Sequence, residues 1–211
     1  MLIEIFSDVI CPWCFIGKRR LDRVLDGPLG EGVALRWRPF QLYPDLPLDG
    51  VDRRTLLTRR YGDKADPARI PERIRVEAEM EGIQLRFDLM QRTPNTLLAH
   101  RVLEFAADAG LQHQLAEALF VAYFCQGSDV GDRMTLLDVA VEVGLDRTAL
   151  DTYLQSGGGV DSIATQLARA PELGVSGVPG YYLADAFLLP GAQSAETMTQ
   201  IIERVKQKLG T

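Results

Sequence analysis

The chain has 211 residues, with 23 Lys and Arg against 29 Asp and Glu, so its formal net charge is −6 at pH 7. Hydrophobic residues make up 46% and charged residues 25%, which are the proportions of an ordinary globular protein. This acidic balance argues against a nucleic-acid or anionic-membrane surface, because either partner attracts a basic patch. No apolar run approaches the roughly 20 residues that cross a membrane. We therefore expect neither a nucleic-acid partner nor a membrane partner.

The N-terminal segment, MLIEIFSDVICPW, differs from a secretory signal. It carries an acid, Glu4, no basic residue precedes its apolar stretch, and it has no small-residue cleavage site. Since a signal peptide has the opposite pattern, the sequence predicts a cytoplasmic location. The three cysteines are also too few for a disulfide scaffold.

The first forty residues follow a β-α-β pattern. Residues 2–6 alternate between apolar and polar side chains and predict a strand, and residues 11–25 show helical spacing. Residues 33–40 alternate again and predict a second strand. Cys11 and Cys14 consequently lie where the first strand passes into the helix.

The middle of the chain is predicted to be helical. Three prolines make residues 39–50 an extended linker, because proline lacks the N–H that regular elements use. After this linker, helical periodicity predicts helices over residues 53–61, 67–82, 96–109, 112–124, 136–143, 148–155 and 161–173.

The last forty residues return to strands. Residues 177–180 form a turn, and short apolar runs over 181–184 and 187–189 predict two strands. An amphipathic helix over residues 195–209 ends the chain. The complete order is β-α-β, then helices, then β-β-α, which is an α/β arrangement.

Two of the three cysteines form the motif Cys11-Pro-Trp-Cys14. Cys11 lies at the predicted start of a helix, where unpaired N–H groups and the positive end of the helix dipole stabilise a thiolate. Pro12 suits the first helical position, and Cys14 falls within the first turn, close enough to form a disulfide with Cys11. Dithiol–disulfide exchange requires an attacking thiolate and a resolving thiol. The motif therefore favours a redox pair over two cysteines buried as small hydrophobes.

Zinc binding is the alternative for two cysteines at this spacing. Cys125, His100 and His113 are the further thiol and imidazole ligands that the chain offers. However, no second CxxC or HxxxH completes a local site, and Trp13 suits an apolar contact better than a metal site. We expect no metal and no organic cofactor, and we interpret Cys125 as a free thiol without a catalytic role.

Several other polar residues have simpler interpretations. His100 and His113 lie on predicted helices, where a lone histidine is more often a surface or core residue than an acid–base catalyst. Asn95 is interpreted as the N-cap of the helix that follows it. Asp8 could act on the proton of Cys14, but we interpret it as the residue that terminates the first strand.

Three segments resemble the DsbA-type thioredoxin superfamily, namely FSDVICPWCFIGK (6–18), GVSGVPG (174–180) and PGAQ (190–193). More narrowly, the chain resembles the FrnE-like branch, which is similar to 2-hydroxychromene-2-carboxylate isomerases and other kappa-class, glutathione-using proteins. Residues 95–101 and 117–124 fit that branch as well. The resemblance covers essentially the whole chain.

The resemblance implies an α/β, thioredoxin-like fold with an inserted all-helical domain. Residues 1–40 and 174–211 would form the discontinuous thioredoxin-like domain, and residues 41–173 the helical insertion. This division agrees with the order of strands and helices predicted above.

The resemblance also implies roles for individual residues. Cys11 corresponds to the exposed nucleophile and Cys14 to the resolving thiol. Val178-Pro179 matches the loop whose cis-proline faces the cysteine pair, so Pro179 joins the catalytic set. The backbone of Val178 would be open for the substrate to pair with it like an added strand. The residues expected to bind substrate are accordingly Pro12, Trp13 and Val178.

These observations predict a thiol–disulfide oxidoreductase that acts on a disulfide- or thiol-containing protein or on a small thiol. The alternative is a glutathione-dependent isomerase or transferase with a small aromatic substrate, although isomerase relatives typically have serine at the position of Cys11. Glutathione is kept as a co-substrate in either case. The cations considered for its carboxylates are Lys18, Arg19, Arg38 and Arg92.

Overall fold

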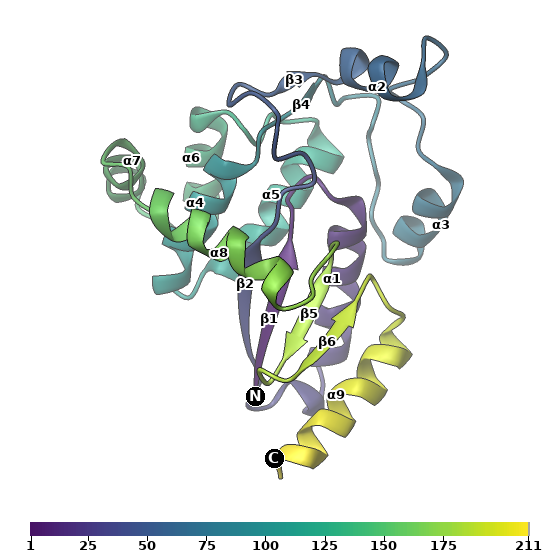
Figure 1. The fold of residues 1–211 in the computed structure, drawn as a ribbon, viewed down its shortest axis with the longest axis vertical. Coiled ribbons are helices and arrows are strands. Elements are labelled where there is room, and N and C mark those ends of the chain that lie inside the picture. The colour runs from purple at the N-terminus through teal and green to yellow at the C-terminus, as the bar shows by residue number, and fades with distance from the viewer. Residues whose placement is uncertain (211) are drawn as a thin grey trace.

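A mixed four-stranded sheet organises residues 1–210, the part of the chain that this computed structural model describes (Figure 1). Its strands, in spatial order, are β2 (Ala34–Pro39), β1 (Leu2–Ser7), β5 (Gly180–Leu183) and β6 (Phe187–Pro190). β1 runs parallel to β2 and antiparallel to β5, which pairs antiparallel with β6. The α/β class and the predicted order of β-α-β, helices and β-β-α are confirmed.

Helices surround the sheet and fill the middle of the chain. Their bounds are α1 (Pro12–Leu25), α2 (Arg53–Tyr61), α3 (Glu72–Met80), α4 (Leu97–Asp108), α5 (Gln112–Gln126), α6 (Arg133–Glu142), α7 (Arg147–Gln155), α8 (Val160–Glu172) and α9 (Ala195–Leu209), with a 3-10 turn at Pro28–Gly30. Phe15 of α1 stacks on Phe120 of α5, with ring centroids 5.2 Å apart, and both belong to one hydrophobic core. Within residues 1–210, no helix is both long enough and apolar enough to cross a membrane.

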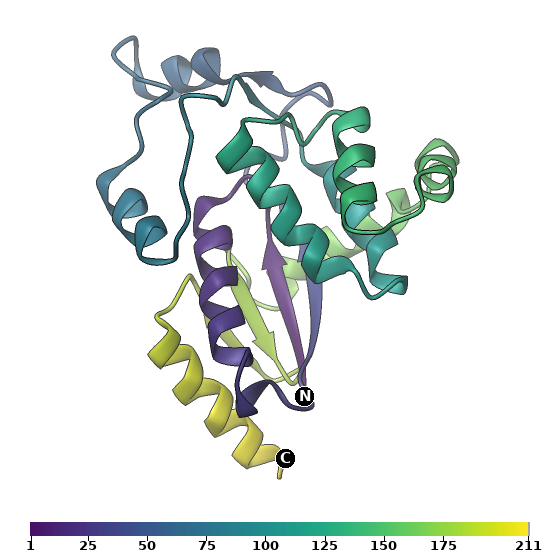
Figure 2. The ribbon, with the colours of Figure 1, turned by 180° about the vertical axis from the view of Figure 1, so that it is seen from behind.

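Different helices cover the two faces of the sheet. Ile3 of β1 packs with Leu21 of α1 and Met198 of α9, and Figure 2 shows α1 and α9 together in front of the strands. Phe6 belongs to a separate cluster with Ala170 of α8, the helix that crosses in front of the strands in Figure 1. This layered arrangement fixes β1, and with it the segment that carries the cysteine motif.

Three local predictions need correction. The helix predicted over residues 67–82 begins only at Glu72, because Pro71 disfavours the helical conformation of the residue before it. The helix predicted over 136–143 begins earlier, at Arg133, because Asp132 caps it by accepting the N–H of Thr135. The sequence also does not predict the ladder of β3 (Val51–Asp52) and β4 (Arg92–Thr93), since two residues are too few to show alternation.

The division into two domains stays a prediction. α8 falls within the predicted insertion of residues 41–173, yet it contacts both β2 of the sheet and α4. The connection between the two parts is therefore extensive on this face of the molecule (Figure 1).

Candidate active site

The cysteine motif lies at the first turn of α1. After β1 ends at Ser7, the N–H of Cys11 donates to Asp8 O at 3.0 Å and closes a tight turn. Cys11 is the N-cap residue of α1 with an extended backbone, and Pro12 occupies the first helical position. The N–H of Cys14 donates back to Cys11 O at 3.0 Å. The predicted placement of the motif at the junction of strand and helix is confirmed.

Cys11 is buried, so the expectation that it is exposed is wrong, while its role as the nucleophile stays a prediction. Only 3% of the residue is exposed. The reason is the loop before β5, which lies over the cysteine: Cys11 Sγ is 3.7 Å from Val178 O, within reach of a weak thiol hydrogen bond. The peptide bond between Val178 and Pro179 is cis. The structure thus brings together the cysteine pair and the Val178-Pro179 loop, although 163 residues lie between Cys14 and Val178 in the sequence.

Cys14 lies deeper in the same site. Burial raises its pKa well above the usual value, and its hydrogen bond with the Cys11 thiol raises the pKa further, whereas the Ser7 side chain and the Asp8 N–H lower it. Burial also raises the pKa of Cys125, at the end of α5. Because Cys14 and Cys125 are both held in the thiol form near neutral pH, Cys11 at the start of α1 is the thiol best placed to attack.

A buried tyrosine lies beneath the cysteines. The Tyr181 hydroxyl has no hydrogen-bond partner in residues 1–210, and burial together with the charges of Cys14 and Cys11 raises its pKa well above the usual value. A Cβ at Gly17 would collide with this hydroxyl. Gly17 therefore allows α1 to approach β5 closely at a point one turn from Cys14.

Tyr181→Phe is expected to raise the free energy of unfolding by about 1 kcal/mol, because a buried hydroxyl without a partner costs about 1–3 kcal/mol. Urea unfolding measures the change. The matched control is Tyr182→Phe, which removes a hydroxyl that donates to Asp185 O at 2.8 Å and should lower stability slightly. If Tyr181→Phe were the more destabilising of the two, the hydroxyl would have a partner in the folded protein.

Asp8 is more than a strand terminator. It is fully buried, and Asp8 Oδ2 accepts the N–H of Leu42 at 2.7 Å, which ties the linker to the end of β1. Burial raises its pKa to about 7, although the bond from Leu42 opposes this shift. His100 Nε2 lies 3.8 Å from Asp8 Oδ1 and 2.9 Å from Phe40 O, and burial lowers the pKa of His100 to about 4.

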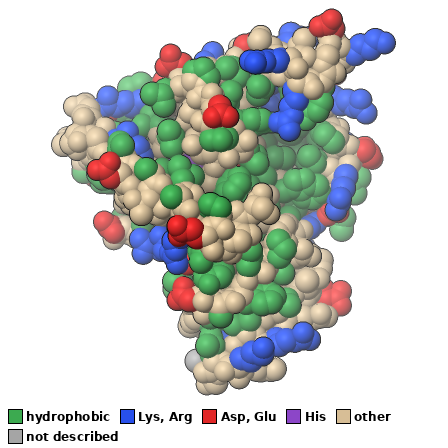
Figure 3. Space-filling model, in the orientation of Figure 1, with side chains coloured by type: hydrophobic (Ala, Val, Ile, Leu, Met, Phe, Trp, Pro, Cys, Tyr) green, Lys and Arg blue, Asp and Glu red, His purple; other side chains and the backbone are tan. Residues whose placement is uncertain are grey.

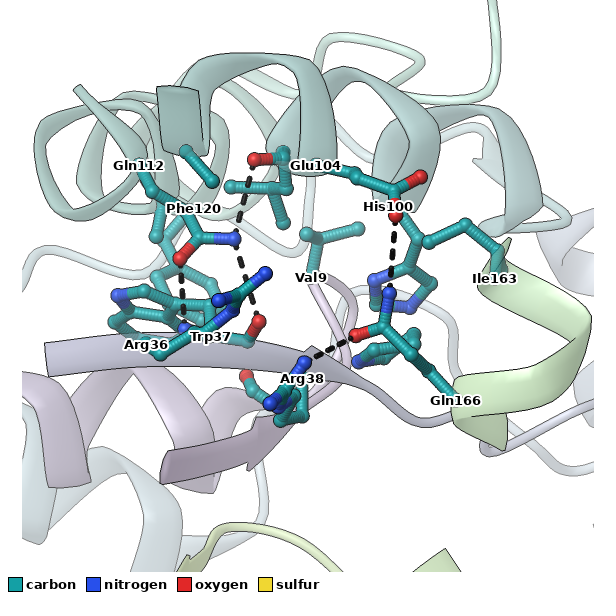
Figure 4. Close-up of a pocket in the computed structure, with 15 residues that line it drawn as sticks. Val9, Arg36, Trp37, Arg38, His100, Glu104, Gln112, Phe120, Ile163 and Gln166 are labelled. Atoms are coloured by element: carbon teal, nitrogen blue, oxygen red, sulfur yellow. Dashed lines mark hydrogen bonds between the residues drawn. The ribbon is translucent and has the colours of Figure 1, made fainter. Parts of the chain in front are cut away.

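Figure 4 shows where His100 lies. It borders a cavity of about 20 Å³ beside β2, which has room for about one water molecule and not for a substrate. The walls are held by amide side chains: Gln112 Oε1 accepts the N–H of Trp37 at 2.8 Å, and Gln166 accepts from Arg38 at 3.0 Å. His100 therefore has a structural position, in agreement with its interpretation as a core residue.

His113, considered as a metal ligand, and Asn95, considered as a helix cap, each have contacts of their own away from the cysteine pair. His113 Nε2 lies 2.7 Å from Asp22 and its Nδ1 accepts the indole N–H of Trp37 at 3.2 Å, which places it between α1 and β2. Asn95 Oδ1 accepts the N–H of Leu97 at 3.0 Å at the start of α4, although Thr96 occupies the N-cap position. Among residues 1–210, no group of three or more His, Cys, Asp or Glu side chains could hold a metal ion.

A cavity of about 590 Å³ opens beside the cysteine motif, between the start of α1 and helices α2, α3 and α5. Ile10 and Pro12, the neighbours of Cys11, form part of its wall. The other lining side chains are largely apolar and include Leu56, Leu57, Ile74, Phe87, Met90 and Phe124. Figure 3 shows this apolar hollow below α2 and beside α3.

The cations at this cavity differ from those considered in the sequence. Lys18 lies 2.6 Å from Asp22, and Arg92 lies 3.1 Å from Asp129; Arg19 and Arg38 are also ion-paired, with Glu117 and Glu4. In the described part of the chain none of these four lines the cavity, whose basic residues are Arg53, Lys64 and Arg69. Their clustering after residue 52 in an acidic chain is the signal that could have identified them.

Trp13 lies at the edge of this region. It is half-buried and packs against the core, and the guanidinium of Arg73 on α3 sits 5.2 Å from the centre of its ring. A cation over an aromatic face is attractive, so this contact holds α3 against the cysteine motif.

Comparisons with known proteins found a matching family model, a related sequence and similar structures. The family model described as the DSBA-like thioredoxin domain matches residues 2–203. The uncharacterized protein YwbO of Bacillus subtilis (strain 168) is 27% identical over 207 residues, covering 98% of each chain. The crystal structure of the probable DsbA oxidoreductase SCO1869 from Streptomyces coelicolor is 30% identical with a TM-score of 0.84, covering 97% of this chain and 89% of that one.

A more distant structure has the same fold. The structure of 2-hydroxychromene-2-carboxylate isomerase is 18% identical with a TM-score of 0.70, covering 100% of this chain and 98% of that one. The predicted resemblance and the predicted thioredoxin-like fold with inserted helices are confirmed.

Proposed function

The chain belongs to the DsbA-like thioredoxin family, and from that premise we propose that it is a thiol–disulfide oxidoreductase whose redox pair is Cys11 and Cys14. One observation carries the proposal: two thiols share the first turn of α1, with Cys11 at the N-cap against the Val178-Pro179 loop and Cys14 buried below it. This is the arrangement that an attacking and a resolving thiol need.

In the proposed mechanism, the Cys11 thiolate attacks one sulfur of a substrate disulfide. A Cys11–substrate disulfide forms, and the other half of the substrate leaves as a thiolate and takes up a proton. Cys14 then loses its proton and attacks Cys11 Sγ, which releases the second half as a thiol. Two electrons and two protons pass from the protein to the substrate, and Cys11–Cys14 is left as a disulfide.

Pro179, Pro12, Trp13 and Val178 have supporting roles in this proposal. Pro179 lies against the cysteine helix, since a Cβ at Gly17 would be 3.2 Å from its ring. The O of Val178 faces Cys11, Pro12 lines the adjacent cavity, and the Trp13 ring packs against the Arg73 guanidinium of α3. From these contacts we expect the substrate sulfur to approach Cys11 between the Val178-Pro179 loop and the cavity.

Glutathione is the proposed co-substrate that restores the dithiol. One molecule attacks the Cys11–Cys14 disulfide, and a second displaces it, so that glutathione disulfide leaves. This assignment agrees with a cytoplasmic location, where glutathione is the abundant thiol. Arg53, Lys64 and Arg69 replace the four cations considered earlier as the partners for its carboxylates, because they line the cavity beside Cys11.

Alkylation of the reduced protein tests which thiol attacks. Iodoacetamide at pH 7 should modify Cys11 first, because burial raises the pKa of both Cys14 and Cys125 and keeps them protonated. Peptide mass spectrometry follows the modification, and exchange activity should fall in step with it. Cys125→Ser is the control and should keep full activity. Faster modification of Cys125, with activity retained after Cys11 is blocked, would contradict the assignment.

A further inference from the structure

We propose that the cavity beside Cys11 selects small disulfides with an apolar body and an anionic group, and that disulfides on folded proteins are poor substrates. The proposal rests on the proposed function and names its substrate class. Three properties of the site carry it: the access to Cys11, the size and lining of the cavity, and the charge around it.

Access to the nucleophile is restricted. Cys11 is 3% exposed, and its Sγ lies against Val178 O on one side. Its two sequence neighbours, Ile10 and Pro12, both line the cavity, so the cavity borders the motif where the thiol is attached. In this proposal a small disulfide held in the cavity extends past Ile10 and Pro12 to the sulfur of Cys11, whereas a disulfide on the surface of a folded protein is too bulky to be held there.

The cavity has the dimensions and lining of a small-molecule site. Its volume of about 590 Å³ falls within the roughly 300–1,000 Å³ typical of such sites. Its walls combine aliphatic side chains from α2 and α3 with the aromatic rings of Phe87, Tyr123 and Phe124. Burying apolar surface here is favourable by about 25 cal/mol per Å², so the lining favours an apolar ligand body over a polar one.

The charge around the cavity has the opposite sign to that of the whole protein. Arg53, Lys64 and Arg69 line it together with one acid, Asp66, in a chain whose net charge is −6. Asp66 accepts the N–H of Ala68 at 3.0 Å, and the guanidinium of Arg53 is held 5.0 Å from the centre of the Phe87 ring. A cleft with this excess of cations attracts anions and raises their local concentration.

The chemical step is the exchange already described. A reduced protein and a disulfide RS–SR give the Cys11–Cys14 disulfide and two RSH, with the two electrons supplied by the protein thiols. The anionic group of RS–SR would lie near the three cations while its sulfur approaches Cys11. The atoms and electrons of this reaction balance with the two protein thiols and the substrate disulfide alone.

Single-turnover kinetics with four oxidants test the selection. The reduced protein is mixed with 5,5′-dithiobis(2-nitrobenzoate) (aromatic, anionic), 4,4′-dithiodipyridine (aromatic, neutral), cystamine (aliphatic, cationic) or insulin. Each second-order rate constant is divided by that of free dithiothreitol with the same oxidant, which removes the intrinsic reactivity of the disulfide. The normalised constant should be about tenfold higher for the anionic aromatic probe than for the neutral one, and lowest for cystamine and insulin.

Charge variants separate the cavity from general electrostatics. Arg69→Gln and Arg53→Gln should each reduce the normalised constant for the anionic probe about threefold or more, with little change for the neutral probe. Arg54→Gln is the matched control, because Arg54 lies on the same helix but does not line the cavity. It should change neither constant. Raising the ionic strength should lower the anionic preference in the native protein.

Two different failures can be distinguished. If the native protein reduces all four oxidants with similar normalised constants, or if Arg54→Gln and Arg69→Gln have equal effects, the substrate class is wrong and the exchange function stands. If the native protein reacts no faster than its Cys11→Ser variant with every oxidant, the proposed function itself is wrong.

Discussion

Cys14→Ala is expected to accumulate mixed disulfides between Cys11 and its substrate. Cys14 is needed only after Cys11 has bonded to the substrate sulfur, so its removal leaves the attack intact and prevents release through the internal disulfide. The adducts should appear as reducible bands on a non-reducing gel, or as mass additions of one half-disulfide for a small substrate. Turnover should fall by about two orders of magnitude or more, because the two cysteines act as one catalytic unit.

Cys11→Ala is the matched control for this trap. It should form no adduct and lose roughly 10³-fold or more of the exchange activity, since it lacks the attacking sulfur. Glutathione can replace the missing thiol, so the Cys14→Ala trap must be run with and without it. Added glutathione should release the trapped substrate and restore part of the turnover.

The same pair of variants separates the oxidoreductase from a glutathione-dependent isomerase. The structural likeness to 2-hydroxychromene-2-carboxylate isomerase shows a shared fold and leaves the reaction to be decided by the site. An isomerase that uses glutathione needs no resolving thiol. If Cys14→Ala trapped nothing and kept full activity on a small aromatic substrate, the isomerase would replace the oxidoreductase.

Local patterns in the sequence predict the framework of this site well. The last helix has the predicted bounds, Ala195 to Leu209, because Ser194 caps its start and Gly210 ends it in the left-handed conformation. The position of Cys11 at the start of α1 also follows from a short strand, a turn and a proline at the first helical residue. Each of these depends on residues only a few positions apart.

The features that sequence reasoning missed depend on distant segments. The burial of Cys11 requires Val178 to lie over it, and no local pattern reports that contact. The charge of the cavity likewise requires α2 and α3 to face the start of α1. The cluster of basic residues after residue 52 is visible in the sequence, but its position beside Cys11 is not. Elements that pair over only two residues, such as β3 and β4, have no periodicity from which to predict them.

Asp8 and His100 are two buried groups that should make stability depend on pH between pH 4 and 7. Burial raises the pKa of Asp8 from 3.8 to about 7 and lowers that of His100 from 6.5 to about 4. In the unfolded chain both should titrate near their ordinary values. Between pH 4 and 7 the folded protein therefore keeps a proton on Asp8 that the unfolded chain has lost, so this group makes stability fall as pH rises.

His100 has the opposite effect over an overlapping range. Between pH 4 and 6.5 the unfolded chain holds a proton on this imidazole that the folded protein lacks, so stability rises with pH. At 1.36 kcal/mol per pKa unit, Asp8 changes stability by about 4 kcal/mol and His100 by about 3 kcal/mol. The two contributions largely cancel between pH 4 and 6.5, and the effect of Asp8 continues alone to pH 7.

Single substitutions should reveal each contribution. Asp8→Asn keeps an oxygen that can accept the N–H of Leu42 but has no titrating proton, so its stability relative to the native protein should increase by about 4 kcal/mol between pH 4 and 7. His100→Gln keeps an N–H for Phe40 O, and its relative stability should decrease by about 3 kcal/mol between pH 4 and 6.5. Urea unfolding at each pH gives both differences. A difference for Asp8→Asn that does not depend on pH would mean that Asp8 is already ionised in the folded protein, and that the carboxylate rather than the acid supports the turn that carries Cys11.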